Sequence, residues 1–237
     1  MTEYYTTRPS FPTRLRHGVD FREDFTCGLN ASNEVGEKRW TISAIGGSQV
    51  PNFQSASAGR FGLTRNRTSG VAAQGTVLGQ SSVLHLPAVR PATFTFETSI
   101  AIPAGTDDEV EHWVGFATDS TSDAKVATAT NFVGVRYLAA AAGSQDWIGV
   151  VKDGAASETL TTLITDAGAF MHFKFVRTGT GIQWYVNDVA TGAVVTTTIP
   201  AAGLSAVIGS LETAASGGSQ KQLDIDYFQY YATGLER

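Results

Sequence analysis

The strongest constraint on the fold is a short alternation of apolar and polar residues that recurs along the chain between turn-forming residues. Residues 93–102 place Phe94, Phe96 and Ile100 on one side of an extended segment and polar side chains on the other. A period of two is typical of a half-buried β-strand. Comparable segments occur at residues 20–26, 38–44, 59–65, 111–119, 131–138, 146–153, 171–177, 181–188, 189–200, 206–213 and 223–231.

Helical spacing is missing from every segment of ten or more residues. Asn187 and Asp188 lie between two alternating segments and predict a tight hairpin turn. Many short strands at this spacing predict an all-β sandwich in which two antiparallel sheets pack their apolar faces together. Because no low-complexity linker interrupts residues 21–237, we expect them to form one domain.

The last alternating segment changes phase in its middle. Leu223, Ile225 and Tyr227 share one face with two aspartates between them, and Phe228 and Tyr230 then continue the aspartate face. Two large aromatic side chains on the polar face of a strand are expected to be shielded from water by another part of the protein or by a partner. The sequence therefore assigns Phe228 and Tyr230 to an assembly contact, either with the N-terminal segment or with a neighbouring subunit.

Residues 1–20 differ from the rest, because they combine Pro9 and Pro12 with aromatic and basic residues and show no period. Such a segment is typical of an extended arm. We expect the arm to lock onto neighbouring subunits, as arms do around symmetry axes. Its candidate assembly contacts are Tyr4, Tyr5, Arg8, Phe11, Arg14 and Arg16.

The charge of the chain excludes several classes of protein. The net charge is −5; residues 1–100 hold ten Lys/Arg against seven Asp/Glu, and residues 101–237 hold seven against fifteen. The chain lacks the dense basic patch that is typical of nucleic-acid-binding proteins. We assign Arg60, Arg65 and Arg67 to a contact with an acidic protein surface.

The cysteine count and the apolar segments constrain the class of protein further. Cys27 is the single cysteine, so no internal disulfide forms. Neither a signal peptide nor an apolar segment of membrane-spanning length occurs, and no membrane contact is expected.

The order of the motifs resembles a known family. FREDF, KRWTIS, TFTFETSIAIP, EHWVGFATDS, NFVGVRY, DWIGVVKDG, FMHFKFV, IQWYVND and LDIDYFQYY follow one another between Phe21 and Tyr231. This series resembles the concanavalin A-like jelly roll of laminin-G and lectin-like modules, and more narrowly the modules of tailed-bacteriophage virion proteins. The resemblance implies a jelly-roll β-sandwich, and a shared fold does not fix function.

Glucanases of this fold carry Glu-x-Asp-x-x-Glu on one strand, because alternate residues face one cleft. That motif is absent, and the acidic run at residues 107–111 is interpreted as a solvated turn. No nucleophile elbow, phosphate loop or metal-ligand spacing occurs either. His17, His85, His112 and His172 are scattered. The sequence therefore predicts that the chain is not an enzyme and holds neither a cofactor nor a metal.

A carbohydrate-binding role is the alternative that the aromatic residues keep open. Trp113 and Trp147 are candidates for stacking on a sugar, with Asp119, Asp123 and Asp146 as polar partners or, as a weaker alternative, calcium ligands. Trp184 is in phase with apolar neighbours and is expected in the core.

A structural role agrees with an unexported chain that needs no disulfide and carries an arm. The sequence thus predicts a bacteriophage virion protein, made in the bacterial cytoplasm, that decorates or cements the capsid. We expect a homotrimer that contacts the major capsid or tail protein. A tail or fibre module and a lectin-like protein with weak glycan binding stay open as alternatives.

Overall fold

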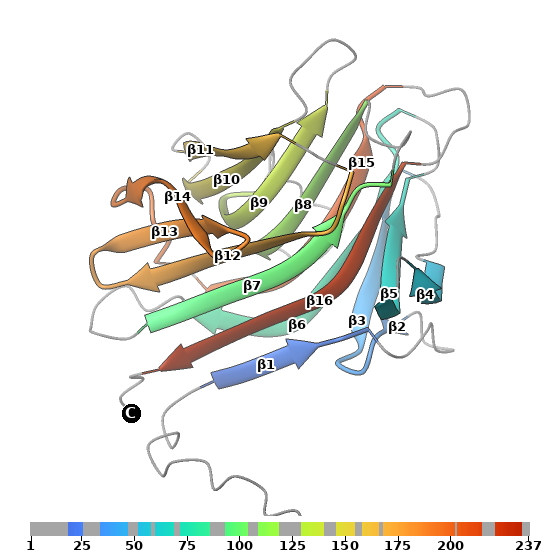
Figure 1. Ribbon diagram of the computed structural model, residues 1–237, viewed down its shortest axis with the longest axis horizontal. Helices are drawn as coiled ribbons and strands as arrows, with labels where there is room; N and C mark the ends of the chain where they lie inside the picture. The colour runs from blue at the N-terminus through green and yellow to red at the C-terminus, as the bar shows by residue number, and fades with distance from the viewer. Residues whose placement is uncertain are drawn as a thin grey trace, which may run out of the picture.

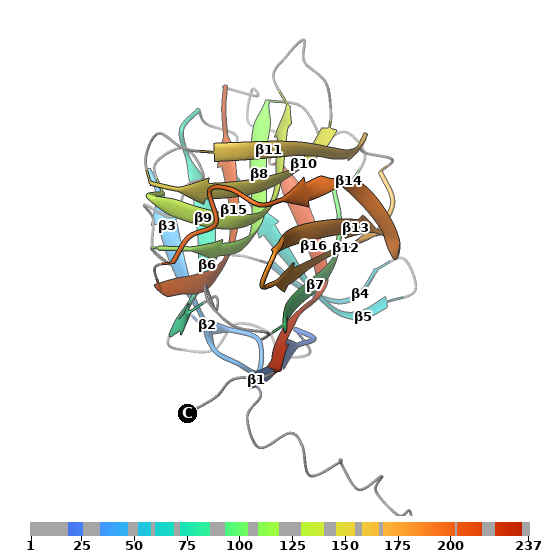
Figure 2. The same cartoon turned by 90° about the vertical axis from the view of Figure 1, so that its left-hand side faces the viewer.

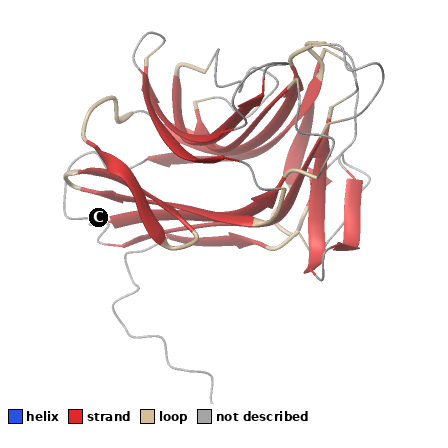
Figure 3. Ribbon diagram, turned by 45° about the horizontal axis from the view of Figure 1, so that its top comes forward, coloured by secondary structure: helices blue, strands red, loops and turns tan. Residues whose placement is uncertain are grey.

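The computed structural model describes residues 19–25, 34–46, 52–57, 60–68, 72–85, 93–103, 109–118, 129–139, 146–154, 158–165, 168–201, 203–214 and 221–233. This part of the chain forms two antiparallel sheets, as the alternation predicts, and contains no helix (Figure 1 and Figure 3). Accordingly, none of the described residues form a helix long and apolar enough to cross a membrane. The all-β prediction is confirmed.

Sheet A holds eight strands. Seven follow one another across the sheet: β14 (Val189–Val195), β13 (Gly181–Val186), β12 (Met171–Thr178), β7 (Thr93–Ala101), β16 (Gln222–Thr233), β5 (Arg60–Arg67) and β4 (Asn52–Ser57). The eighth strand, β1 (Val19–Glu23), also pairs with β16. Strand β16 has room for β5 and β1 on one edge because β5 pairs with its first residues and β1 with its last (Figure 1).

Sheet B also holds eight strands. Their order is β11 (Glu158–Thr165), β10 (Asp146–Asp153), β9 (Asn131–Ala139), β8 (Val110–Ala117), β15 (Gly203–Glu212), β6 (Gly75–His85), β3 (Trp40–Ile45) and β2 (Glu34–Val35). Strand β15 pairs with β6 on one side and β8 on the other. The last two strands of the chain, β15 and β16, therefore lie inside sheet B and sheet A, each between two earlier strands.

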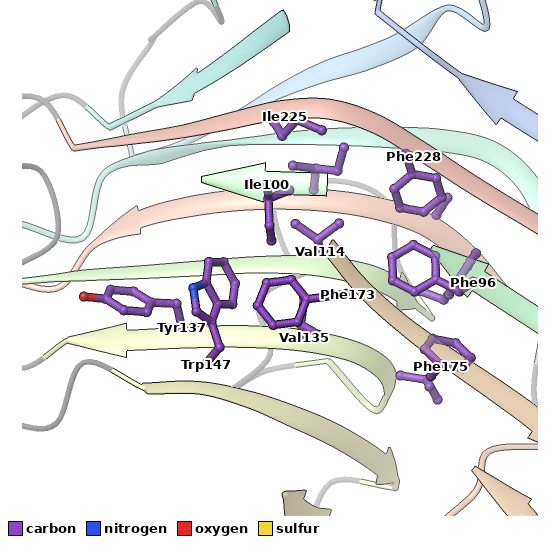
Figure 4. Packing of buried hydrophobic residues seen from close by; sticks show 14 of the residues in the cluster. Phe96, Ile100, Val114, Val135, Tyr137, Trp147, Phe173, Phe175, Ile225 and Phe228 are labelled. Atoms are coloured by element: carbon purple, nitrogen blue, oxygen red, sulfur yellow. The ribbon is translucent and has the colours of Figure 1, made fainter. Parts of the chain in front are cut away.

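Aromatic side chains from both sheets form the core between them (Figure 4). Phe116 of sheet B packs edge-on against Phe96 and Phe228 of sheet A, with ring centroids 5.4 and 5.6 Å apart. All three side chains are fully buried. Burial of each contributes about 1.5–3 kcal/mol relative to exposure, so this contact is a main reason why the sheets stay together.

The edge strands β11 and β14 lie beside each other where the two sheets meet, a relation visible in two views (Figure 1 and Figure 2). The hydroxyl of Thr159 in β11 is 2.8 Å from that of Thr198, which follows β14. Gly192 lies so close to Thr161 that a Cβ there would be 2.3 Å from the threonine methyl. This contact closes one side of the sandwich and covers two sheet edges.

A β-bulge explains the change of phase in β16. Ile225 pairs with Ile100 and Tyr227 pairs with Ser99, so Asp226 is an extra residue on β16. One inserted residue turns every following side chain to the other face. Phe228 and Tyr230 consequently face the same core as Ile225.

Phe228 and Tyr230 are covered within this chain, which corrects their assignment to a subunit contact. Phe21 of β1 stacks on Tyr230 at 4.7 Å, and Trp40 of β3 packs edge-on against Phe228 at 4.9 Å. Both residues are almost completely buried. From the alternation, Phe228 and Tyr230 were predicted to lie on the outer face of the strand. The bulge at Asp226 places them on the core face, and the alternation alone gives no sign that a residue has been inserted.

The N-terminal boundary also differs by two residues from the prediction. Val19 and Asp20, placed in the arm by the sequence, pair with Ala232 and Tyr231 in the first strand. Residues 1–18 lie outside the described residues, and with them all six candidate arm contacts.

Candidate functional site

A row of polar and aromatic residues crosses five strands on the outer face of sheet A. Cross-strand pairing joins Tyr185 to Lys174, Lys174 to Glu97, Glu97 to Gln229, and Gln229 to Arg22. We call these five residues the cross-strand row. They face outward because the neighbouring positions on the same strands point into the core. Four inter-strand steps of about 4.8 Å give the row a length of about 19 Å.

Hydrogen bonds fix the middle of the row. The Gln229 side-chain N–H₂ group donates to Glu97 Oε2 at 2.6 Å, and the Arg22 guanidinium donates to Gln229 Oε1 at 3.4 Å. Lys174 Nζ is 4.0 Å from the other oxygen of Glu97. Side chains held this way lose little further freedom when a ligand binds, so the row is organised in advance.

An ion pair anchors the end of the row at the hairpin that joins β13 to β14. Lys174 Nζ donates to Asp188 Oδ1 at 2.9 Å and lies 5.0 Å from the centre of the Tyr185 ring. The hydrogen bond to Asp188 raises the pKa of Lys174, and the same bond lowers the pKa of Asp188. Both groups therefore stay charged at neutral pH. The hairpin turn itself, with positive φ at Asn187 and Asp188, is the one that the sequence predicts.

Three tyrosines lie on this face: Tyr185 is part of the row, and Tyr227 and Tyr231 lie beside it on β16. Tyr185 and Tyr227 are half-buried, and Tyr231 is 39% exposed. The Arg22 guanidinium carbon lies 5.5 Å from the centre of the Tyr227 ring. Tyrosine combines an apolar ring with a polar hydroxyl, so a half-exposed ring can contact both the carbon face and the hydroxyls of a ligand.

The tryptophans proposed for sugar stacking lie elsewhere, and their assignment is corrected. Trp147 is fully buried between the sheets, with its ring 5.4 Å from Tyr137 and 5.0 Å from Phe173 (Figure 4). Trp184 is in the core, as predicted, with Phe175 edge-on at 5.3 Å. A ring that is closed in on both sides offers no face to a sugar.

Trp113 is fully buried on the opposite, outer face of sheet B. There it belongs to the outer cluster, whose members are Ile45, Val77, Trp113, Ala117, Ala129, Phe132, Val150 and Val207. The indole lies against Gly209, where an added Cβ would be 2.0 Å from the ring. Glu111 and Arg136 form an ion pair beside it at 2.9 Å. Because Trp113 has no exposed area, it too offers no stacking face.

We expect Gly209→Ala to lower the free energy of unfolding by about 1–3 kcal/mol, because the added methyl group overlaps the Trp113 indole. Thermal or denaturant unfolding measures the loss. In a Trp113→Phe background the smaller ring leaves room for the methyl group, so the second substitution should there cause a smaller loss. Equal losses in both backgrounds would contradict the steric explanation.

The other predicted site residues are not gathered into one place by the described structure. Asp146 begins β10 and accepts a hydrogen bond from Thr165 at 2.8 Å, far in the fold from the row, while Asp119 and Asp123 are outside the described residues. Arg60, Arg65 and Arg67 lie on β5, and only their backbone is described. Within the described ranges, no three metal-binding side chains come together.

Solved structures with a similar architecture were found by comparison. An immunostimulatory antigen and pseudo β-1,3-glucanase of Mycobacterium tuberculosis is similar with a TM-score of 0.62 and 8% identity, over 90% of this chain and 98% of that chain. A β-glucanase of Bacillus licheniformis has a TM-score of 0.57 and 13% identity, over 89% and 97%. The CBM2 module of the evolved Dit of Lactobacillus casei BL23 phage J-1 has a TM-score of 0.54 and 11% identity, over 93% and 98%.

The chain has the concanavalin A-like jelly-roll fold. This fold was expected from the order of the motifs. The sequence itself matches no protein-family model and no curated protein. At 8% to 14% identity the likeness shows the fold, and the narrower membership among phage virion proteins stays a prediction.

The prediction that the chain is not an enzyme is overturned by the same comparison. Several structures with this architecture are named glucanases or glycosidic hydrolases. The missing Glu-x-Asp-x-x-Glu motif was too narrow a criterion, because it tests one arrangement of carboxylates on one strand. Enzymes therefore belong among the classes of protein that this fold supports.

Proposed function

We propose that the chain is a carbohydrate-binding jelly-roll module and that the outer face of sheet A is its binding surface. The observation that carries this proposal is the cross-strand row with its three tyrosines. A sugar presents an apolar face of C–H groups and a rim of hydroxyls. Half-exposed tyrosine rings can pack against the C–H face, and a fixed carboxylate, amide and guanidinium can form hydrogen bonds with the hydroxyls.

The extent of the row favours a chain of sugars over a single one. About 19 Å separates the strands that carry its two ends, Tyr185 and Arg22. A ligand that contacts both ends needs several rings in succession. Each contact is modest, so affinity depends on the number of subsites filled.

The names of the structural neighbours support the same class of ligand. A phage carbohydrate-binding module and several glucanases share this architecture. The phage module also supports a place in a virion. Decoration or cementing of a capsid, a homotrimer and a contact with a major capsid or tail protein remain proposals from the sequence.

Tyr185→Ala and Tyr231→Ala should each weaken binding to a soluble oligosaccharide about tenfold or more, equivalent to about 1.4 kcal/mol. Calorimetry against a panel of oligosaccharides measures this, with thermal melting as the check on folding. Leu160→Ala on β11 of sheet B, an exposed apolar residue away from the row, is the matched control and should bind as the unmodified chain does.

Release of reducing ends should be recorded in the same samples, since named glucanases share the fold. If the oligosaccharides bind and neither tyrosine substitution weakens that binding, the binding surface is not the outer face of sheet A. If no oligosaccharide or cell-wall polysaccharide binds, the proposed function itself is wrong.

A further inference from the structure

We infer that the glycan bound by the cross-strand row is uncharged and that Glu97 is the residue that recognises its hydroxyl groups. This inference rests on the proposed function and specifies its ligand. It depends on the balance of charge on the outer face of sheet A, on the pairing of the cations there and on the position of Glu97.

Carboxylates outnumber cations around the row. The described side chains of β1 and the residue after it, of β7, of β12 and of the hairpin after β13 supply two permanent cations and four carboxylates to this face; His172 of β12, near Glu97 and Asp188, is a further cation only when protonated. The cations are Arg22 and Lys174, and the carboxylates are Asp20, Asp24, Glu97 and Asp188. The chain as a whole also has a net charge of −5. An anionic polysaccharide bound at the row therefore meets more carboxylates than cations, and like charges raise the free energy of the complex.

Both cations already have carboxylate partners. Arg22 Nε donates to the two oxygens of Asp24 at 2.8 and 3.0 Å, and Lys174 Nζ donates to Asp188 at 2.9 Å. A uronate, sulfate or phosphate group on a ligand would have to displace one of these carboxylates. Since the displaced carboxylate stays nearby, the exchange gains little.

Glu97 lies at the centre of the row and has acceptor capacity that the described contacts leave available. Oε2 accepts the Gln229 amide and is 3.9 Å from His172 Nε2, and Oε1 is 4.0 Å from Lys174 Nζ; both of these longer distances are beyond hydrogen-bond distance. Its side chain is 17% exposed. An ionised carboxylate only accepts hydrogen bonds, so it selects hydroxyl donors, and bonds to a charged acceptor are the stronger kind. Sugar hydroxyls are such donors.

The experiment compares uncharged oligosaccharides of β-1,3-glucan and β-1,3-1,4-glucan with an anionic polymer, polygalacturonate, at about 0.05 and 0.5 M NaCl. Contacts between charges weaken at the higher salt, and contacts to an uncharged ligand do so far less. We expect the uncharged ligand to bind with a dissociation constant that changes less than about twofold between these conditions. Polygalacturonate should bind at least about tenfold more weakly at either salt concentration.

Glu97→Gln should weaken binding of the uncharged ligand about tenfold, because the amide keeps the bond from Gln229 and loses the charged acceptor. Glu158→Gln, an exposed residue at the start of β11, is the matched control and should change nothing. Full binding by folded Glu97→Gln overturns the role of Glu97.

Polygalacturonate that binds more tightly, weakens with salt and is lost in Lys174→Met would overturn the inference and leave carbohydrate binding intact. Absence of binding to every saccharide would overturn both the inference and the proposed function.

Discussion

Glu23→Ala should lower the free energy of unfolding by about 3–5 kcal/mol, one of the two largest effects that we expect. The Glu23 side chain is almost completely buried. Its Oε1 accepts hydrogen bonds from the backbone N–H groups of Phe25 at 2.8 Å and Glu37 at 3.1 Å, and its Oε2 accepts one from Lys38 at 2.7 Å. Alanine would leave three backbone donors without this acceptor.

The position of Glu23 explains why the effect should reach beyond one turn. Glu23 ends β1 of sheet A, whereas Glu37 and Lys38 form the turn between β2 and β3 of sheet B. One carboxylate thus joins the two sheets at this end of the sandwich. The bond to the Phe25 amide also holds the Phe25 ring, which is buried against Trp40 with centroids 5.7 Å apart.

Denaturant unfolding of two variants and a control tests this interpretation. Glu23→Gln keeps one acceptor oxygen and turns an N–H₂ group toward a backbone donor, so it should lower the free energy of unfolding by about 1–3 kcal/mol. Glu158→Ala removes an exposed carboxylate and should change stability by less than about 0.5 kcal/mol. A loss in Glu23→Ala as small as in Glu158→Ala would show that the three hydrogen bonds contribute little.

Most strands could be predicted from the sequence, including β8, which is buried along its whole length, but β6 and β11 could not. Strand β6 was missed because Val77 faces the outer cluster and Leu78 faces the core, so its segment shows no alternation. Strand β11 was missed for the opposite reason: it is an edge strand whose threonines carry little apolar signal. Length and turn residues alone do not distinguish such segments from loops.

The sequence showed the residues of the cross-strand row as positions on the outer faces of their strands, but it did not show that these residues lie next to one another. Glu97 and Gln229 are 132 positions apart in the sequence and become neighbours through the register of β7 and β16. That register depends on the bulge at Asp226, which the alternation did not reveal. The burial of Trp113 likewise depends on Gly209, a residue on another strand.

Acid should destabilise the chain through His112, the second of the two largest effects. Its side chain lies on β8 and is fully buried, with Nδ1 2.8 Å from the hydroxyl of Ser210 and the ring stacked near Tyr137. Burial lowers the pKa of His112 from 6.5 to about 3, because the charged imidazolium is disfavoured away from water. The histidine is thus neutral in the folded chain at neutral pH.

The direction of the pH effect follows from the two pKa values. In the unfolded chain His112 binds a proton near its ordinary pKa of 6.5, whereas the folded chain resists protonation down to about pH 3. The unfolded state therefore gains protons first as the pH falls. Stability from the neutral histidine is complete above pH 6.5 and is lost progressively toward pH 3, by about 2 kcal/mol at pH 5 and about 3 kcal/mol at pH 4.

Urea unfolding at pH 7, 5 and 4 measures this loss, and His112→Gln isolates it from the protonation of carboxylates. Glutamine keeps a polar atom for Ser210 and does not titrate, so the variant should be less stable at pH 7 but should lose about 2 kcal/mol less than the unmodified chain between pH 7 and 5. His172→Gln, on the outer face of sheet A, is the control and should retain the steep acid dependence. Parallel stability curves for the unmodified chain and His112→Gln would mean that the buried imidazole accepts a proton in the folded state with little penalty, and that the core around β8 admits water.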